Sequence, residues 1–508
     1  MGRHRIEKPT VLLLAETGFI IRNLLLGEFA PRIARHARLI VAVLDPKDPM
    51  LTTIAHQHGF ELIDFPREQP FIYSRTWDRI RSWEGRIYGI KLAERDNQSM
   101  KIQTRLFLNS TSTHKKIELY SLIIQGKIIT ALRLGKRMER QFLHYVLNKE
   151  IAQQWKKRLQ HIRPDLVFST MLSHSTMFRH NSDLPVVVAA HSLGIPVVTL
   201  IQSWDNISSK ASILPSWLKK VYVWSESMQQ ELQHLHPQIR PQNIEIVGSP
   251  QFDYHNNTSY CQQREDFMHK MGLDPSRPYI LMGTGTAKWM PNEPQKVVHL
   301  LERLRTEMPE MQMLVRLHPK DTINRWEPFI NELTKNGCIL RVTSPPKHMD
   351  QGGFVPPRNF YEEQVNAILH SVAVINSSSS LTVDAALLDK PVICIAYDLE
   401  QDPLFPEGRA YAYTQSVHYA RLVRTKGVWV VRSEDECLHA IRTYYQHPEL
   451  HRNERKKLVD KVTKDVGKPS GEYLADRVLD LLNELSIENS HNKPPFPSHE
   501  VEHKIKME

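Results

Sequence analysis

Short apolar runs and helical patterns alternate in the first part of the chain. Residues 11–15 are uniformly apolar, and residues 19–29 follow with apolar positions at helical spacing. Residues 39–44 are a second candidate for a buried strand, and residues 60–65 are a third. Strands that alternate with helices in this way are typical of parallel βαβ units. We therefore expect the chain to open with a doubly wound sheet.

A long basic segment interrupts this alternation between residues 67 and 160. Its pattern is helical, for example over residues 128–160. Strand patterns then resume at residues 165–169, 196–201, 220–224 and 244–247. We predict a first domain over residues 1–255, with a basic helical insertion at about residues 67–160.

The polar stretch of residues 255–265 is interpreted as the connection to a second domain, placed at residues 256–485. Strand patterns recur there at residues 279–282, 312–316, 372–375 and 391–396. Residues 486–508 contain three prolines and few apolar residues, so a disordered tail is expected. The predicted fold class is α/β, with two doubly wound domains facing a cleft and a helical insertion in the first.

Length and composition support this division. A chain of 508 residues is too long for one ordinary core, and 41% hydrophobic and 24% charged residues are typical of soluble globular proteins. No apolar run approaches the length of about 18 residues that a membrane-spanning helix needs, and no secretory signal is expected at the start. The four cysteines are far apart and lack metal-site spacing, which indicates free thiols and a cytoplasmic protein.

The net charge of +10 is concentrated in the insertion. Residues 67–160 hold 20 Lys and Arg against 8 Asp and Glu, so the rest of the chain is about −2. Such an excess can attract anionic lipid or a phosphorylated acceptor, and could bring the protein to the inner face of a membrane. The alternative is a solvated helical face. No nucleic-acid-binding motif accompanies the charge, so nucleic acid is not expected as a partner.

Three loops of the second domain follow predicted strands, where open α/β sheets bind ligands. Small residues in the first let backbone amides approach a phosphate, although a plain glycine turn is the alternative. In the second, Arg316 can bind phosphate oxygens and His318 precedes Pro319 on extended backbone, unless Arg316 pairs structurally with an acid and His318 caps a loop. The first loop consists of Gly283, Thr284, Gly285 and Thr286.

The third loop is a run of four serines before a predicted helix over residues 381–388. Hydroxyls and free amides at a helix entry can bind an anion, whereas helix capping alone would need only one serine. Asp384 then either complements the helix dipole or meets a substrate hydroxyl. The four residues are Ser377, Ser378, Ser379 and Ser380.

The first domain supplies the facing wall of the expected cleft. Gly18 and Arg22 follow its first strand, and His174 lies in the loop after residues 165–169. Trp204, Asp205 and Asn206 follow residues 196–201 and could form an acceptor platform, although Trp204 could equally be core and its neighbours an Asx turn. Candidate acceptor contacts are Gly18, Arg22, Trp204 and Asn206.

These motifs resemble bacterial GT-B glycosyltransferase-like proteins. Residues 189–253, with Gln202-Ser203-Trp204-Asp205-Asn206 and the run from Val247 to Asp253, resemble the first half of that fold. Arg316 to Pro319, the serines and the run from Lys390 to Val392 are similar to the donor half of CDP-glycerol glycerophosphotransferases, capsule polysaccharide transferases and sialyltransferases. The resemblance covers about residues 11–64 and 165–399. It implies two Rossmann-like domains and a donor phosphate at His318 and at Ser378 or Ser379.

The leading hypothesis is a metal-independent transferase with no cofactor. It would move a glycosyl or glycerophosphate group from a nucleotide-activated donor to a lipid or saccharide hydroxyl, as the resemblance implies for bacterial surface polysaccharide or glycolipid synthesis. His174 or Asp205 would act as the base, and the donor loops would neutralise the leaving nucleotide. An Asp-x-Asp metal motif is absent from the sequence. The alternatives are a non-hydrolysing nucleotide-sugar epimerase and a non-catalytic module that binds a nucleotide sugar or an anionic polymer.

Overall fold

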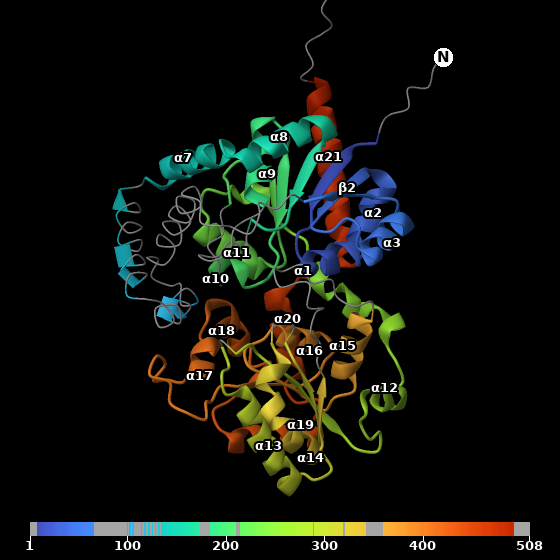
Figure 1. Cartoon of the computed structure of the whole chain (residues 1–508), viewed down its shortest axis with the longest axis vertical. Helices are drawn as coiled ribbons and strands as arrows, with labels where there is room; N and C mark the ends of the chain where they lie inside the picture. Colours follow the sequence, from blue (N-terminus) through green and yellow to red (C-terminus); the bar gives the residue numbers. More distant parts are fainter. Residues whose placement is uncertain are drawn as a thin grey trace, which may run out of the picture.

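The computed structural model describes residues 8–65, 134–172, 183–209, 214–287, 289–318, 321–341 and 359–491. It also describes single positions of the insertion: 99, 101, 102, 104, 105, 113, 116, 117, 120, 121, 124, 128, 131 and 132. Two α/β domains lie one above the other in Figure 1, each built on a parallel sheet with helices around it.

The first domain is a seven-stranded sheet of order β3-β2-β1-β4-β5-β6-β7, parallel throughout. The order reverses between β1 and β4, which makes it doubly wound. All five residues of β1 are buried, as expected for a strand covered on both faces. The strands are β1 (Thr10–Leu14), β2 (Arg38–Val43), β3 (Glu61–Asp64), β4 (Leu166–Ser169), β5 (Val197–Leu200), β6 (Lys220–Val223) and β7 (Ile244–Ile246).

The second domain repeats the plan in six parallel strands of order β10-β9-β8-β11-β12-β13. Its reversal lies between β8 and β11. The predicted fold class, two doubly wound domains, is therefore confirmed. The strands are β8 (Tyr279–Gly283), β9 (Gln312–Arg316), β10 (Cys338–Arg341), β11 (Val374–Asn376), β12 (Val392–Ile395) and β13 (Trp429–Val431).

Helices cover both sheets. Those of the first domain are α1 (Gly18–Ile20), α2 (Phe29–His36), α3 (Pro49–His58), α7 (Gly135–Leu147), α8 (Glu150–Ile162), α9 (Asp183–Ser192), α10 (Asn206–Ser209) and α11 (Glu226–Leu235). Those that follow are α12 (Arg264–Met271), α13 (Glu293–Glu307), α14 (Ile330–Lys335), α15 (Phe360–Leu369), α16 (Leu381–Leu387), α17 (Arg409–Thr414), α18 (Val417–Arg424), α19 (Glu434–Gln446), α20 (Arg452–Val462) and α21 (Ser470–His491).

Several boundaries differ from the sequence-based expectation. The single helix expected over residues 19–29 is α1, then a π-helical turn (Ile21–Leu25), then a break before α2. The predicted insertion extended to residue 160, but α8 belongs to the domain core, because Trp155 and Leu159 are each 1% exposed. The basic residues of α8 led to its assignment to the insertion, but the same helix also has this buried face. The short edge strands β10 and β13 were not predicted.

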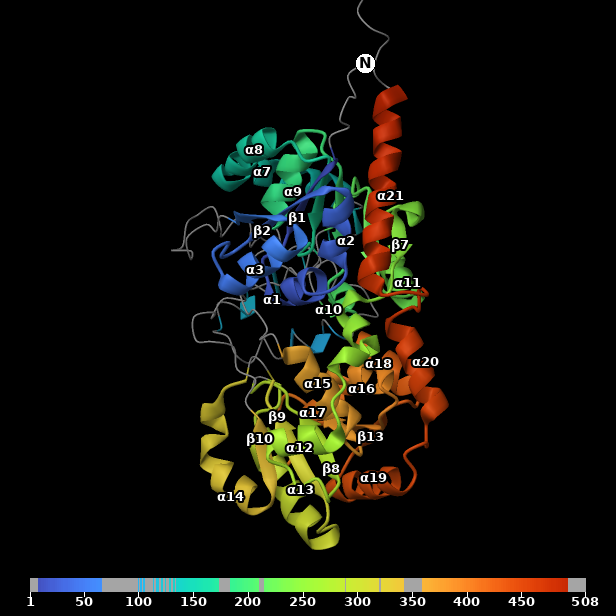
Figure 2. The ribbon, with the colours of Figure 1, turned by 90° about the vertical axis from the view of Figure 1, so that its right-hand side faces the viewer.

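The last helix returns to the first domain instead of completing the second. In Figures 1 and 2, α21 runs along the first domain beside α2, and Arg32 Nε lies 2.8 Å from Asp476 Oδ1. Asp253, in the linker between the domains, accepts the amides of Ser470 and Gly471 at 2.7 Å each. The two points where the chain crosses between domains are thus fastened together. The helix ends at His491, so the start predicted for the tail, residue 486, falls within it.

No helix in the described ranges is both long enough and apolar enough to cross a membrane.

Candidate functional site

A cavity of ≈ 610 Å³ lies between the two domains. One wall is formed by the loops after β8, β9 and β11, and the facing wall by the segment after β5. Since β8 and β11 flank the reversal of strand order, the cavity occupies the usual ligand crevice of a doubly wound sheet. The residues singled out in the sequence that line it are Trp204, Asp205, Thr284, Gly285, Thr286, His318, Ser377, Ser378, Ser379 and Ser380.

The serine loop (residues 377–380) connects β11 to α16, and its Ser379 Oγ accepts the amide of Leu381, the first helical residue, at 3.3 Å. Ser380 precedes the first helical residue, but it makes no capping hydrogen bond. Asn376 holds the turn instead. Its Oδ1 accepts hydrogen bonds from the Ser379 amide at 3.0 Å and from the Thr382 hydroxyl at 3.1 Å. Helix capping therefore accounts for the Ser379 hydroxyl at most, and not for the hydroxyls of Ser377 and Ser380.

Two serines of this loop line the cavity and have polar groups without a partner in the described structure. The amides and hydroxyls of Ser377 and Ser380 make no hydrogen bond to any other residue in the described ranges, and both residues line the cavity. Between them Ser378 has a φ of 54°, in the left-handed region that serine rarely adopts. Such strain clusters at ligand-binding turns, where it makes neighbouring amides converge on an anion. The loop therefore offers two amides and two hydroxyls to an anionic ligand.

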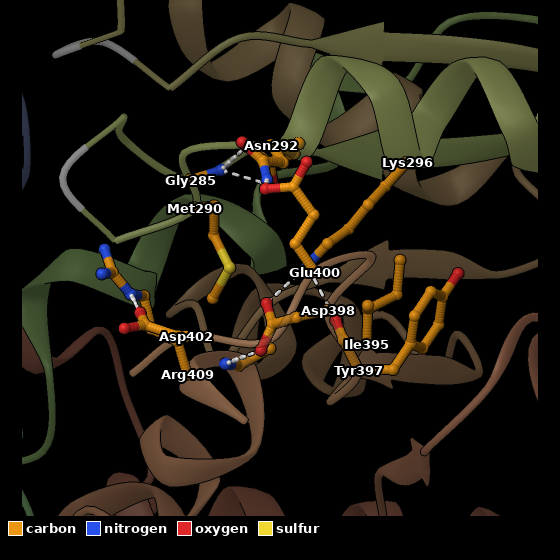
Figure 3. A network of polar contacts seen from close by, with 12 residues as sticks. Gly285, Met290, Asn292, Lys296, Ile395, Tyr397, Asp398, Glu400, Asp402 and Arg409 are labelled. Carbon is orange, nitrogen blue, oxygen red and sulfur yellow. Dashed lines mark hydrogen bonds and ion pairs between the residues drawn. The ribbon is translucent and has the colours of Figure 1, made fainter. Parts of the chain in front are cut away.

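The glycine–threonine loop (residues 283–286) uses its polar groups inside the protein. The Gly285 amide donates to Glu293 Oε1 at 3.0 Å and to Oε2 at 2.8 Å (Figure 3). Thr284 Oγ1 accepts the His318 amide at 2.9 Å. The Gly283 position is filled by Leu381, whose Cδ2 would lie 2.2 Å from an added Cβ. Among the described residues, the Thr286 amide and hydroxyl have no hydrogen-bond partner, so Thr286 keeps the role expected of this loop.

A buried charge network lies next to this loop (Figure 3). Glu293 is 1% exposed, and burial raises its pKa to about 7, although Arg325 opposes the rise from 3.0 Å away. Lys296 Nζ lies 2.9 Å from Asp398 Oδ1 and donates to the Tyr397 carbonyl at 2.7 Å. The network ties α13, which carries Glu293 and Lys296, to the segment after β12.

The first-domain wall places an acid at the cavity. Asp205 Oδ1 accepts the Ser203 hydroxyl and Oδ2 accepts the Ser209 hydroxyl at 2.8 Å. Trp204 meets His418 of the second domain edge to face, with ring centroids 4.9 Å apart. The two hydroxyls orient the Asp205 carboxylate, and a fixed carboxylate at a ligand cavity is suited to accept a proton.

Helices α17 and α18 complete the second-domain wall, and sequence reasoning missed them. Tyr413, Ser416 and His418 line the cavity. The Tyr413 hydroxyl is buried and has no hydrogen-bond partner among the described residues. Burial raises its pKa well above the usual value, so it is a neutral donor. An unpaired buried hydroxyl costs free energy, so Tyr413 is a candidate ligand contact.

The insertion reaches across to the second domain. Ser99 and Ile102 line the cavity, and Ser99 Oγ accepts the Val417 amide at 2.9 Å. Arg105 Nη1 lies 2.7 Å from Glu407 Oε1. Sequence reasoning gave the insertion only a surface role, because nothing in its pattern marks a contact some 300 residues away along the chain.

Arg316 and Asp384 lie outside the cavity lining. Arg316 is buried, and its Nη1 donates to Gln364 Oε1 at 2.9 Å. Asp384 is also buried; it accepts the Tyr254 hydroxyl at 2.7 Å and lies 3.2 Å from His255 Nε2. Asp384 thus holds the second domain against the linker, whereas the Arg316 bond lies within the second domain; a donor contact by either side chain stays a prediction.

The remaining candidates on the first domain are not among the residues that line the cavity. Gly18 begins α1, Arg22 lies in the π-helical turn and is 8% exposed, and Asn206 begins α10 and is 1% exposed. His174 and Pro319 lie outside the described residues.

All four cysteines are free thiols. Cys394 lies beside the serine loop, with its Sγ 3.7 Å from Ser378 Oγ, and burial raises its pKa. Within the described ranges, no group of three or more His, Cys, Asp or Glu side chains could hold a metal ion.

No protein-family model and no curated protein matches this chain. Among solved structures it is similar to a glycosyltransferase from Rickettsia africae ESF-5, with 11% identity over 94% of this chain and 99% of that one, at a TM-score of 0.49. It is also similar to UDP-GlcNAc 2-epimerase from Neisseria meningitidis bound to UDP-GlcNAc, with 12% identity over 94% of this chain and 100% of that one, at a TM-score of 0.49. The UDP-GlcNAc 2-epimerase from Methanocaldococcus jannaschii has 14% identity over 94% of this chain and 99% of that one, at a TM-score of 0.49. Likeness at this level assigns no activity.

Proposed function

We propose that the protein is a group transferase that holds the phosphates of a nucleotide-activated donor on the serine loop. The observation that carries this proposal is the pair Ser377 and Ser380, whose amides and hydroxyls are unpaired within the described structure at an interdomain cavity. Amides and hydroxyls aimed at a phosphate stabilise the charge that develops on a leaving nucleotide. His318 and Thr286 line the same cavity and complete the donor side.

Asp205 serves as the base on the acceptor side. It would take the proton of an acceptor hydroxyl, whose oxygen bonds to the transferred glycosyl or glycerophosphate group. The bond from that group to the donor phosphate breaks, and its electrons leave with the nucleotide, next to the serine loop. The acceptor is a saccharide or a lipid, the latter reached at the inner face of a membrane through the basic insertion.

Two features favour transfer over the alternatives. An epimerase needs no acceptor, whereas here Ser99 and Ile102 of the insertion add a further wall to the cavity. A purely binding module needs no base, whereas the Asp205 carboxylate is oriented at the cavity by two hydroxyls.

Nucleotide release tests the proposal. The full chain is incubated with UDP-, CDP- and CMP-activated donors, with and without saccharide and lipid acceptors. Release that requires an acceptor supports transfer. A sugar epimer formed without acceptor indicates the epimerase, and binding without turnover indicates the module. Asp205→Asn should lower acceptor-dependent release by about 10²–10⁴-fold while nucleotide affinity stays within about threefold.

A further inference from the structure

Exposed apolar side chains are concentrated on the insertion. Ile117, Tyr120, Ile124, Ile128 and Leu132 are 65%, 54%, 58%, 52% and 61% exposed. The first four are each helical, and the Leu132 amide donates to the Ile128 carbonyl at 2.9 Å. Their spacings of three and four residues place side chains on one face of a helix. We call these five residues the apolar stripe.

The apolar stripe requires an explanation because soluble proteins expose large apolar side chains singly. Elsewhere in the described ranges such side chains are scattered, as at Phe19, Tyr445, Leu450 and Ile487. Five on one helical face match the apolar side of a helix that lies in a membrane interface.

The charge around the apolar stripe identifies its partner. Residues 113–140 contain seven Lys and Arg against two Glu. A second copy of the chain would bring the same positive charge against this one, which disfavours self-association. Nucleic acid offers no apolar surface for the aliphatic side chains. An anionic bilayer satisfies both features, because its lipid phosphates attract the cations and its acyl boundary accepts the aliphatic groups.

The insertion also connects the apolar stripe to the cavity. Ser99 and Ile102 line the cavity, and Arg105 anchors the segment to Glu407. Figure 1 shows the described pieces of the insertion, in cyan and light blue, along one side of the molecule where the two domains meet. A surface bound there lies beside the cavity.

We propose that the apolar stripe docks in the headgroup region of an anionic bilayer, which places the cavity next to the membrane. The docking itself stands independently of the chemistry in the cavity. Only the consequence of docking, that the acceptor is a membrane lipid, rests on the proposed function.

Vesicle flotation of the full chain tests the docking. The wild type should float with vesicles of equal parts phosphatidylcholine and phosphatidylglycerol, remain unbound with phosphatidylcholine alone, and bind less as salt rises. The triple variant Ile117→Ser/Ile124→Ser/Leu132→Ser should lower the partition coefficient by about a hundredfold. Leu450→Ser/Ile487→Ser, which replaces exposed apolar residues elsewhere, is the matched control and should bind as the wild type does.

Three results would overturn the docking. They are no binding to anionic vesicles at low salt, equal binding by the triple variant, and a wild-type dimer in sedimentation that the triple variant breaks. Asp205→Asn and Ser380→Asp, which change only the cavity, should bind vesicles normally. A wild type that does not float with vesicles but shows acceptor-dependent nucleotide release refutes the docking alone. A wild type that floats but binds no nucleotide refutes the proposed function alone.

Discussion

The serine loop and the glycine–threonine loop follow neighbouring strands of one sheet, yet they are used in opposite ways. After β11, the amides of Ser377 and Ser380 have no partner in the described structure. After β8, the Gly285 amide is already bound to the carboxylate of Glu293. A buried carboxylate thus occupies in one loop the place that a ligand anion could take in the other.

In each loop, a residue outside the loop determines whether the backbone amides are already bound. Asn376 holds the serine turn from the strand side and leaves two serines open, whereas Glu293 reaches back from α13 and closes the glycine turn. Small residues at a strand end therefore indicate that an anion site is sterically allowed there. Whether the amides remain available depends on the nearest side-chain acceptor.

The largest effect is expected from Ser380→Asp. A carboxylate facing the cavity from the serine loop repels phosphate, so affinity for whichever of UDP, CDP and CMP binds the wild type should fall a hundredfold or more. Asp is favoured before a helix, so the melting temperature should not fall. Titration calorimetry and thermal unfolding measure the two effects. An affinity within about threefold of wild type would remove the serine loop from the site.

At the glycine–threonine loop, Glu293→Gln should change how the stability of the protein depends on pH. Burial raises the Glu293 pKa from 4.5 to about 7, so the folded state binds the proton more tightly than the unfolded state. The resulting stability is present below about pH 4.5 and is lost as the pH rises through 7. Measured by urea unfolding, the free energy of unfolding should fall between pH 5 and pH 8 by about 2–3 kcal/mol more for the wild type than for the variant. Parallel pH profiles for the two proteins would contradict the assigned burial cost.

A smaller loss should follow from removing hydroxyls while keeping the amides. Ser377→Ala/Ser380→Ala deletes two hydroxyl hydrogen bonds in a loop that is not buried, each worth about 0.7 kcal/mol net, and should weaken nucleotide binding about tenfold. Calorimetric titration at fixed salt measures this. If the double variant binds as the wild type does, the amides alone or another loop hold the phosphate.

The smallest effect is expected for Thr286→Val, the matched change in the glycine–threonine loop. Thr286→Val removes one hydroxyl where the double serine variant removes two, so nucleotide affinity should change by less than about threefold. The same titration applies. A loss larger than that of the double serine variant would reverse the comparison between the loops.

Much of the fold could be predicted from the sequence because its buried parallel strands are uninterrupted apolar runs. All five residues of β1 and of β9 are buried. The edge strands β10 and β13, of four and three residues, were not predicted, and length is not the reason, because β7 and β11 have three residues each and were predicted. The extent of the insertion was overestimated because α8 combines a basic surface with the buried Trp155.

The site was predictable only where it follows the sheet. Trp204, Asp205 and the serines were found because they follow strands. Tyr413 and His418 lie on helices without a motif, and Ser99 enters from a distant insertion, so local pattern could not bring them together. Arg316 is not among the residues that line the cavity, and its Nη1 donates to Gln364, a contact that the local pattern did not indicate.

A crystal structure of the chain with its preferred nucleoside diphosphate is the most direct test of the central claim. The account predicts phosphate oxygens within hydrogen-bonding distance of the Ser377 and Ser380 amides, with the Gly285 amide still bound to Glu293. A phosphate seated on the Gly285 amide with Glu293 displaced, or a nucleotide outside the interdomain cavity, would contradict it.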